Sequence, residues 1–148
     1  MNVEEIIKTR KTMSIETRSI IHLLLVNAKL NDAMNSALKP FDVSLQQFNV
    51  LRILRGQKGL PANLSTLNER MVSKMSNTTR LVDKLLLKGF VNRKTCPTNR
   101  RKVEINITKE GGDLLKEMDK AMELAEAELL TNFTHQDLEE LNILLDKF

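Results

Sequence analysis

The stretch of sequence that decides the fold runs from Leu64 to Gly111 and reads LSTLNERMVSKMSNTTRLVDKLLLKGFVNRKTCPTNRRKVEINITKEG. Apolar residues at helical spacing predict a short helix at its start and a longer helix over about residues 75–87. Two further segments, 90–94 and 103–107, predict strands, the second because apolar and polar residues alternate along it. This order of elements predicts a helix-turn-helix followed by a β-wing, so we expect a mainly α (α+β) fold.

The positive charge of the chain is concentrated in this same stretch. The net charge is +4, but residues 63–110 hold eleven Lys/Arg against four Asp/Glu, while residues 111–148 hold three against ten. A basic middle followed by an acidic end indicates a positive surface that faces a polyanion. The alternative is a solvated charged surface that has no partner; the helix-turn-helix pattern favours the polyanion.

Length and composition exclude several classes of protein. A chain of 148 residues is expected to form one domain, and its single cysteine, Cys96, permits no intrachain disulfide, which is typical of a reducing interior. The longest apolar run near the N-terminus, Leu23–Val26, is far shorter than the roughly 20 residues that a membrane span needs. Glu4 and Glu5 stand where a signal peptide would carry basic residues. We therefore expect a soluble, cytoplasmic protein with no membrane contact.

The sequence also carries no recognisable catalytic or metal-binding pattern. The two histidines, His22 and His135, are far apart, and there is no phosphate-binding glycine loop or nucleophile elbow. We therefore expect no enzyme activity, no metal and no cofactor. Tyrosine and tryptophan are absent, so the stacking platforms of single-strand binders are missing and duplex DNA is the polyanion that fits best.

The helix at 75–87 is the candidate recognition helix. Its inner face is expected to comprise Thr78, Leu81, Val82 and Leu85. This leaves Ser76, Asn77, Thr79 and Arg80 near the N-terminus, where a helix inserted into the major groove contacts base edges. Asn pairs with adenine, Arg with guanine, and Thr meets a thymine methyl group. The alternative is that Ser76 only caps the helix and that Asn77 and Thr79 are solvated.

The loop of the predicted hairpin is the second candidate contact. Pro97 and Asn99 are turn formers, and three cations follow at Arg100, Arg101 and Lys102. Cations at the tip of a hairpin can enter a minor groove or contact phosphates. The alternative is a solvated basic turn.

Cys96 lies among Arg93, Lys94 and Arg100 in the sequence, and nearby cations favour the thiolate. One hypothesis is therefore that oxidation of Cys96 modulates DNA binding. The plainer alternative is a passive small residue in the wing.

Two helices are predicted before the central stretch, after a polar arm at 1–13. Ser14 caps the first of them and Pro40 ends it, because the residue before a proline is pushed out of the helical region. The capping box Ser44-Leu45-Gln46-Gln47 begins the second. Gly59-Leu60-Pro61 is predicted to form a short strand. The buried face of the second helix is expected to comprise Phe48, Leu51 and either Leu54 or Ile53.

Two more helices, capped by Thr108 and Thr134, are predicted after the central stretch. They carry rows of apolar residues, Leu115, Met118, Met122, Ala125 and Leu129 in the first and Leu138, Leu141, Leu144, Leu145 and Phe148 in the second. Little remains in the chain to cover these rows, so we expect a homodimer interface that also includes the N-terminal arm and first helix. A two-fold dimer places its recognition helices about 34 Å apart, as a palindromic site requires.

Five motifs occur in a fixed order between about residues 45 and 112: Leu67-Asn68-Glu69-Arg70-Met71, Thr79-Arg80-Leu81-Val82-Asp83-Lys84-Leu85, Lys88-Gly89-Phe90-Val91, Asn99-Arg100-Arg101, and Ile107-Thr108-Lys109-Glu110-Gly111. In this order and spacing they resemble the MarR family of dimeric winged helix-turn-helix transcriptional regulators. The last two motifs are similar to the family's D-x-R wing signature and its L-T-x-x-G helix start.

The resemblance implies a single domain, 1–148, with a DNA-binding lobe at 44–111 and a dimerisation region at 1–38 and 112–148. It implies a homodimeric repressor of transcription on a palindromic operator, with the recognition helix in the major groove and the wing in the minor groove. Lys84 would face a phosphate and Arg101 the minor groove. The implied DNA-binding residues are Ser76, Asn77, Thr79, Arg80, Lys84, Arg100 and Arg101. A small phenolic or lipophilic effector, bound between the dimer helices and this lobe, is also implied.

Two residues depart from the family pattern. Asn99 stands where the wing signature usually has Asp, so a neutral amide replaces a carboxylate that would hold a wing arginine. Asn68 stands where a small apolar residue commonly packs between the two helices of the motif. We expect Asn68 to be solvated or hydrogen-bonded, because burying an unpaired amide is costly.

An alternative function keeps the same fold as a protein-interaction module without specific DNA binding, its basic face meeting an acidic partner. Binding to a palindromic duplex with a steep salt dependence separates the two hypotheses.

Overall fold

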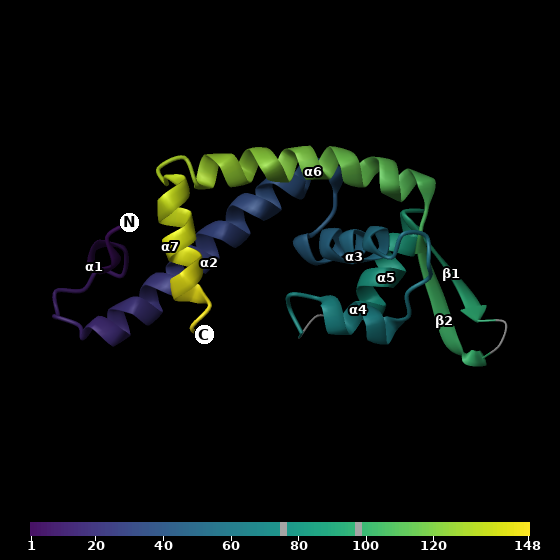
Figure 1. Ribbon diagram of the computed structural model, residues 1–148, viewed down its shortest axis with the longest axis horizontal. Coiled ribbons are helices and arrows are strands. Elements are labelled where there is room, and N and C mark those ends of the chain that lie inside the picture. Colours follow the sequence, from purple (N-terminus) through teal and green to yellow (C-terminus); the bar gives the residue numbers. More distant parts are fainter. Residues whose placement is uncertain (75–76, 97–98) are drawn as a thin grey trace. The chain divides into compact units, whose positions relative to one another are not determined.

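The computed structural model describes residues 1–74, 77–96 and 99–148. It is mainly helical, with one two-stranded antiparallel sheet, as predicted (Figure 1). The chain forms two compact units: Met1–Met34 together with Leu124–Phe148, called the terminal unit below, and Asn35–Glu123, called the winged-helix unit.

The terminal unit contains α1 (Val3–Ile6), most of α2 (Ile15–Leu38), the end of α6 (Lys109–Leu129) and α7 (His135–Leu145). The predicted polar arm therefore includes a short helix. The Arg18 guanidinium donates two hydrogen bonds to the Glu4 carboxylate, at 2.8 and 3.3 Å, and this pair joins α2 to α1. Val3 is completely buried.

The predicted caps of the long helices are present. The Ser14 hydroxyl accepts the Thr17 N–H at 3.3 Å, and α2 ends at Leu38, followed by a 3₁₀ turn, η1 (Lys39–Phe41), that contains Pro40. Thr134 and Asp137 form a capping box at the start of α7.

Three helices form the centre of the winged-helix unit: α3 (Leu45–Gly56), α4 (Leu64–Arg70) and α5 (Thr78–Leu87). The predicted capping box starts α3, because the Ser44 hydroxyl accepts the Gln47 N–H while the Gln47 side chain accepts the Ser44 N–H. The three helices and the sheet share one apolar core, comprising Phe48, Val50, Leu51, Leu54, Leu67, Met71, Val82, Leu85, Val91 and Ile105.

The start of α5 differs from the prediction. The helix was expected from about residue 75, but it begins at Thr78 because Asn77 has a non-helical backbone conformation (φ −73°, ψ 86°) and its side chain accepts the Arg80 N–H at 3.1 Å. Asn77 is therefore the N-cap. The helix ends as predicted, with Gly89 at φ +74° and the Phe90 N–H bonded to the Leu85 carbonyl at 3.0 Å, which is a Schellman motif.

The wing is a hairpin of β1 (Val91–Cys96) and β2 (Asn99–Ile107), both longer than predicted. Val91 pairs with Ile107 and Thr95 with Val103, after which the register shifts. The short strand expected at Gly59–Pro61 is instead an isolated bridge at Ala62, which exchanges two hydrogen bonds with Ile105. The position was wrong because Gly59 lies at φ +89° in the turn after α3, which delays the extended segment.

A tight junction connects the wing to α6. The Thr108 hydroxyl donates to the Gly89 carbonyl at 2.7 Å and accepts the Gly111 N–H at 3.0 Å, while the Thr108 N–H bonds the Phe90 carbonyl at 3.0 Å. A Cβ on Gly111 would lie 2.1 Å from the Phe90 oxygen, so only glycine fits at this position. These contacts explain the Thr-x-x-Gly spacing physically.

The two apolar rows of the C-terminal helices have different environments. Leu115, Met118 and Met122 of α6 are buried within the chain, so the expectation that this row lacks cover in its own chain was wrong for these residues. In α7, by contrast, Leu144 is 58% exposed and Phe148, just beyond the helix, 88%. Among the described residues, no helix combines the length and the apolar character that a membrane crossing requires.

Candidate nucleic-acid interface

The outer face of α5 carries the predicted polar contacts. Asn77, Thr79, Arg80 and Lys84 are exposed, whereas Thr78, Val82 and Leu85 are buried in the helix-turn-helix core. This division follows from the amphipathic spacing of the helix. Ser76, the remaining residue predicted on this helix, lies outside the described residues.

A hollow of about 440 Å³ lies between the start of α3, the turn after α4 and α5. Three of the predicted contacts, Asn77, Arg80 and Lys84, line it together, whereas Thr79 does not. The other lining residues are Ser44, Gln46, Ser73 and Leu81. The hollow thus combines two cationic side chains with short hydrogen-bonding groups, which suits the phosphates and base edges of DNA.

Gln46 and Ser73 were not among the residues predicted for this site. Gln46 is exposed in the first turn of α3 beside the buried Gln47, and Ser73 is exposed in the turn before α5. The capping box fixed the phase of α3 and therefore already placed Gln46 outside its buried face. What the sequence did not contain is the packing of α3 against α5.

Asn77 caps α5 at this hollow and keeps further hydrogen-bonding groups available. Its Oδ1 atom accepts the Arg80 N–H, which anchors the first turn of α5. Bidentate pairing with adenine uses both the oxygen and the NH₂ group of an asparagine. Because the carbonyl oxygen has two lone pairs, the cap leaves one acceptor position and both amide protons for a base.

Side-chain hydrogen bonds connect α4 to α5 and to the turn between the two helices. The Thr78 hydroxyl donates a hydrogen bond to Oδ1 of Asn68, and the Lys74 ammonium donates one to the Glu69 carbonyl near the end of α4. Asn68 is also exposed, so the expectation that it is solvated or hydrogen-bonded is confirmed. The Asn77 cap, by contrast, lies within the start of α5.

The wing is attached to the recognition helix by an ion pair. The Arg93 guanidinium of β1 lies 2.8 Å from the Asp83 carboxylate of α5, with both side chains about half exposed. Arg100 and Arg101 belong to β2, between Asn99, which pairs with Cys96, and Val103, which pairs with Thr95. The cationic run therefore lies at the register shift, while its side chains and that of Cys96 lie outside the described part.

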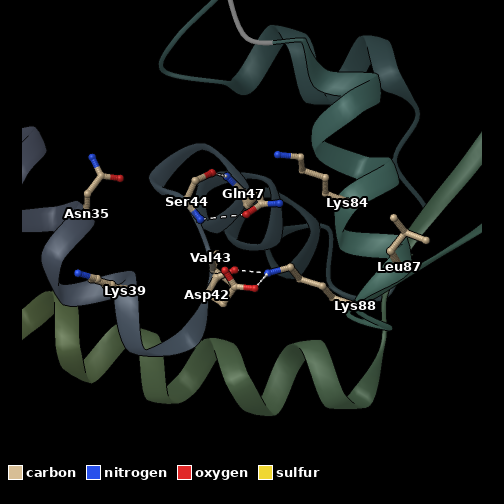
Figure 2. Close-up of a pocket in the computed structure, with 9 residues that line it drawn as sticks. All are labelled: Asn35, Lys39, Asp42, Val43, Ser44, Gln47, Lys84, Leu87 and Lys88. Carbon is tan, nitrogen blue, oxygen red and sulfur yellow. Dashed lines mark hydrogen bonds and ion pairs between the residues drawn. The ribbon is translucent and has the colours of Figure 1, made fainter.

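A second hollow, of about 520 Å³, lies between the end of α2, the start of α3 and the end of α5 (Figure 2). Lys39, Lys84 and Lys88 line it together with Asn35, Ser44, Gln47 and apolar Val43 and Leu87. Lys88 extends from α5 to Asp42 and donates to both its carboxylate and its carbonyl. The hydrogen bond and charge of Lys88 lower the pKa of the Asp42 carboxyl below its ordinary value.

The hollow therefore contains two further ammonium groups, those of Lys39 and Lys84, beside the Lys88–Asp42 pair. Within the described ranges, no group of three or more His, Cys, Asp or Glu side chains is arranged to hold a metal ion.

The capped recognition helix, the wing that follows it and the bridge at Ala62 define a winged helix-turn-helix protein. The model of the MarR family matches residues 43–103. The multiple antibiotic resistance protein MarR of Escherichia coli is 28% identical over 130 residues, which cover 86% of this chain and 87% of that protein. An uncharacterised HTH-type transcriptional regulator of Bacillus subtilis, YfiV, is 35% identical over 99 residues, which cover 65% of this chain and 59% of YfiV.

Among solved structures, a mutant E. coli MarR complexed with operator DNA superposes with a TM-score of 0.77 at 28% identity, covering 90% of this chain and 93% of that one. The chain belongs to the MarR family of transcriptional regulators. The family predicted from the motifs is confirmed, and its members are regulators rather than enzymes.

Proposed function

We propose that the protein binds duplex DNA sequence-specifically, as a homodimer on a palindromic operator, and represses transcription from that site. The observation that carries this proposal is the gathering of Asn77, Arg80 and Lys84 around one hollow at the start of the recognition helix. The related E. coli MarR, solved with operator DNA, supports it.

In this proposal α5 enters the major groove through its N-terminal turn. Ser76, Asn77, Thr79 and Arg80 face base edges there. Lys84, one turn further along the helix, contacts a phosphate. Arg100 and Arg101 of the wing reach the adjacent minor groove, where the negative potential attracts arginine.

The homodimer part of the proposal rests on the terminal unit, because this unit exposes many large apolar side chains. The exposed apolar residues of this unit include Ile6, Ile15, Ile20, Leu23, Leu24, Val26, Leu124, Phe133, Leu141, Ile143, Leu144, Leu145 and Phe148. Large exposed apolar surfaces mark interfaces. A two-fold interface through this unit presents two recognition helices to two half-sites about 34 Å apart.

We retain the domain assignment made from the sequence, although its bounds differ from those of the two compact units. Residues 44–111 form the DNA-binding lobe, and the dimerisation region is drawn from 1–38 and 112–148. The middle of α6 also contacts the lobe, since Asp119 forms an ion pair with Arg55 of α3. Repression then follows from occupancy, because a dimer on an operator excludes other proteins from that duplex.

The second hollow supports the effector that the sequence resemblance implied. Its ammonium groups and the apolar Val43 and Leu87 match a small ligand with an anionic group and an apolar body. Such a ligand would bind next to Lys84, a proposed phosphate contact, and would change DNA affinity through that side chain.

Selection of bound duplexes from a random library tests the proposed function. The expected outcome is a palindrome whose half-sites lie one helical turn apart, bound with a steep dependence on salt. Enrichment of no sequence, together with binding to an acidic protein, would favour the protein-interaction module instead.

A further inference from the structure

The hydrogen bond between Asn68 and Thr78 joins the two helices of the motif directly above the end of α5 that carries the proposed base contacts. Asn68 lies in the last turns of α4, and Thr78 is the first residue of α5. Thr78 is followed by Thr79 and Arg80 and preceded by Asn77, so whatever fixes Thr78 also fixes these neighbours.

The two side chains of this hydrogen bond differ in burial. Thr78 is only 4% exposed, so its hydroxyl must be satisfied inside the protein, and Asn68 accepts it. Asn68 is itself exposed. The buried partner therefore belongs to the recognition helix, and the accessible partner belongs to the supporting helix.

A small apolar residue at position 68 could pack between the helices but could not accept a hydrogen bond. Apolar packing tolerates small rotations, because it is not directional, whereas a hydrogen bond weakens steeply as its angle departs from linearity. The polar pair therefore constrains the rotation of α5 about its own axis more tightly than an apolar contact does.

We propose that Asn68 and Thr78 are specificity-determining positioning residues, whose hydrogen bond holds the N-terminal turn of α5 in the rotation at which Asn77, Thr79 and Arg80 meet base edges. The inference rests on the proposed function and adds to it two residues that touch no base. Their contribution appears in the discrimination between operator and unrelated duplex, not in binding to phosphates.

The test measures the ratio of dissociation constants for unrelated and operator duplexes at one salt concentration. Asn68→Ala and Thr78→Val should each lower this ratio about threefold to tenfold, the effect of one hydrogen bond, with little change for unrelated duplex. Thr78→Ser, which keeps the hydroxyl, should retain the ratio. Ser65→Ala, which removes a hydrogen bond within α4 to Glu69, is the matched control and should also retain it.

The double variant Asn68→Ala/Thr78→Val should be no worse than the poorer single variant, because both changes remove the same bond. Additive losses, or an unchanged ratio in Asn68→Ala, would overturn the inference. If the Thr78→Val variant does not fold, the Asn68→Ala variant still tests the inference, because Asn68 is exposed and its replacement leaves the core intact. A wild-type chain that selects no operator would overturn the proposed function as well, which separates the two failures.

Discussion

The two units of the chain differ in how far their side chains find contacts within the same chain. In the winged-helix unit, the helices, turn and wing are joined to each other by the chain's own contacts: Asn68 with Thr78, Lys74 with Glu69, Arg93 with Asp83 and Arg55 with Asp119. The terminal unit has the Glu4–Arg18 pair but exposes apolar side chains from α1, α2 and α7. The contacts of one unit lie within a single chain, while the other unit exposes the apolar surface through which we propose that a second copy binds.

The largest effect is expected on the stability of the winged-helix unit, at the junction between the wing and α6. Gly111→Ala introduces a Cβ 2.1 Å from the Phe90 carbonyl oxygen, and backbone must shift to admit it. We expect a loss of about 2–4 kcal/mol in the free energy of unfolding, measured by urea denaturation. Gly112→Ala is the matched control, since a Cβ there meets nothing within 4 Å; similar losses in both variants would contradict the steric reason.

The next largest effect is expected on dimerisation through the terminal unit. Leu144→Asp places a charge on the exposed apolar face of α7, where Leu144 is 58% exposed. We expect the dissociation constant of the dimer to rise about tenfold or more, measured by analytical ultracentrifugation, because a carboxylate must be desolvated at the interface. Leu60→Asp, at a 70% exposed position of the winged-helix unit, should leave dimerisation unchanged. Equal effects would remove the distinction between the two units.

A smaller effect separates DNA binding from assembly. Arg101→Ala should weaken operator binding about tenfold and reduce the salt dependence by about one counterion, while the dimer stays intact. Fluorescence anisotropy across a salt series measures both quantities. Lys147→Ala removes a cation near the C-terminal end of the terminal unit and should change neither. Unchanged affinity in Arg101→Ala would mean that the wing does not contact the duplex.

The smallest effect is a response of the N-terminal arm to acid. The hydrogen bond and charge of Arg18 lower the pKa of Glu4 below its ordinary value of 4.5. A lowered pKa in the folded state contributes stability that is present above the ordinary value and is lost as the pH falls through the lowered one. Hydrogen exchange of the amides in α1 should therefore accelerate, relative to the intrinsic rates, as the pH falls below 4.5. In Glu4→Gln this additional acceleration should disappear.

Much of the fold could be predicted because its signals are local. The capping boxes of Ser44 and Thr134 predict helix starts. Gly89 predicts a helix end because glycine readily adopts the positive φ that the structure shows at this position. The start of α5 was misplaced because Ser76 and Asn77 are both good caps, and only the hydrogen bond to Arg80 shows that Asn77 takes the role. The bridge at Ala62 was missed by a similar margin, because it depends on a partner, Ile105, far along the chain.

The candidate site was less predictable than the fold, because it depends on contacts between distant segments. Helical spacing was enough to place Arg80 and Lys84 on the outer face of α5. The packing of α3 beside them, which brings Gln46 to the same hollow, has no local signal. The hydrogen bond from Thr78 to Asn68 has no local signal either. The departure of Asn68 from the family pattern indicated only that position 68 is unusual.

The junction at Phe90 has a mechanical consequence. The carbonyl group of this residue accepts the Thr108 N–H at the start of α6, and its N–H closes the end of α5 on Leu85. Phe90 thus connects the C-terminal end of α5 to the start of α6. Gly111 packs directly against the Phe90 carbonyl group, which leaves no room for this peptide to shift toward α6. A rotation of the first turn of α6 relative to the C-terminal end of α5 would therefore have to break these hydrogen bonds or displace Phe90.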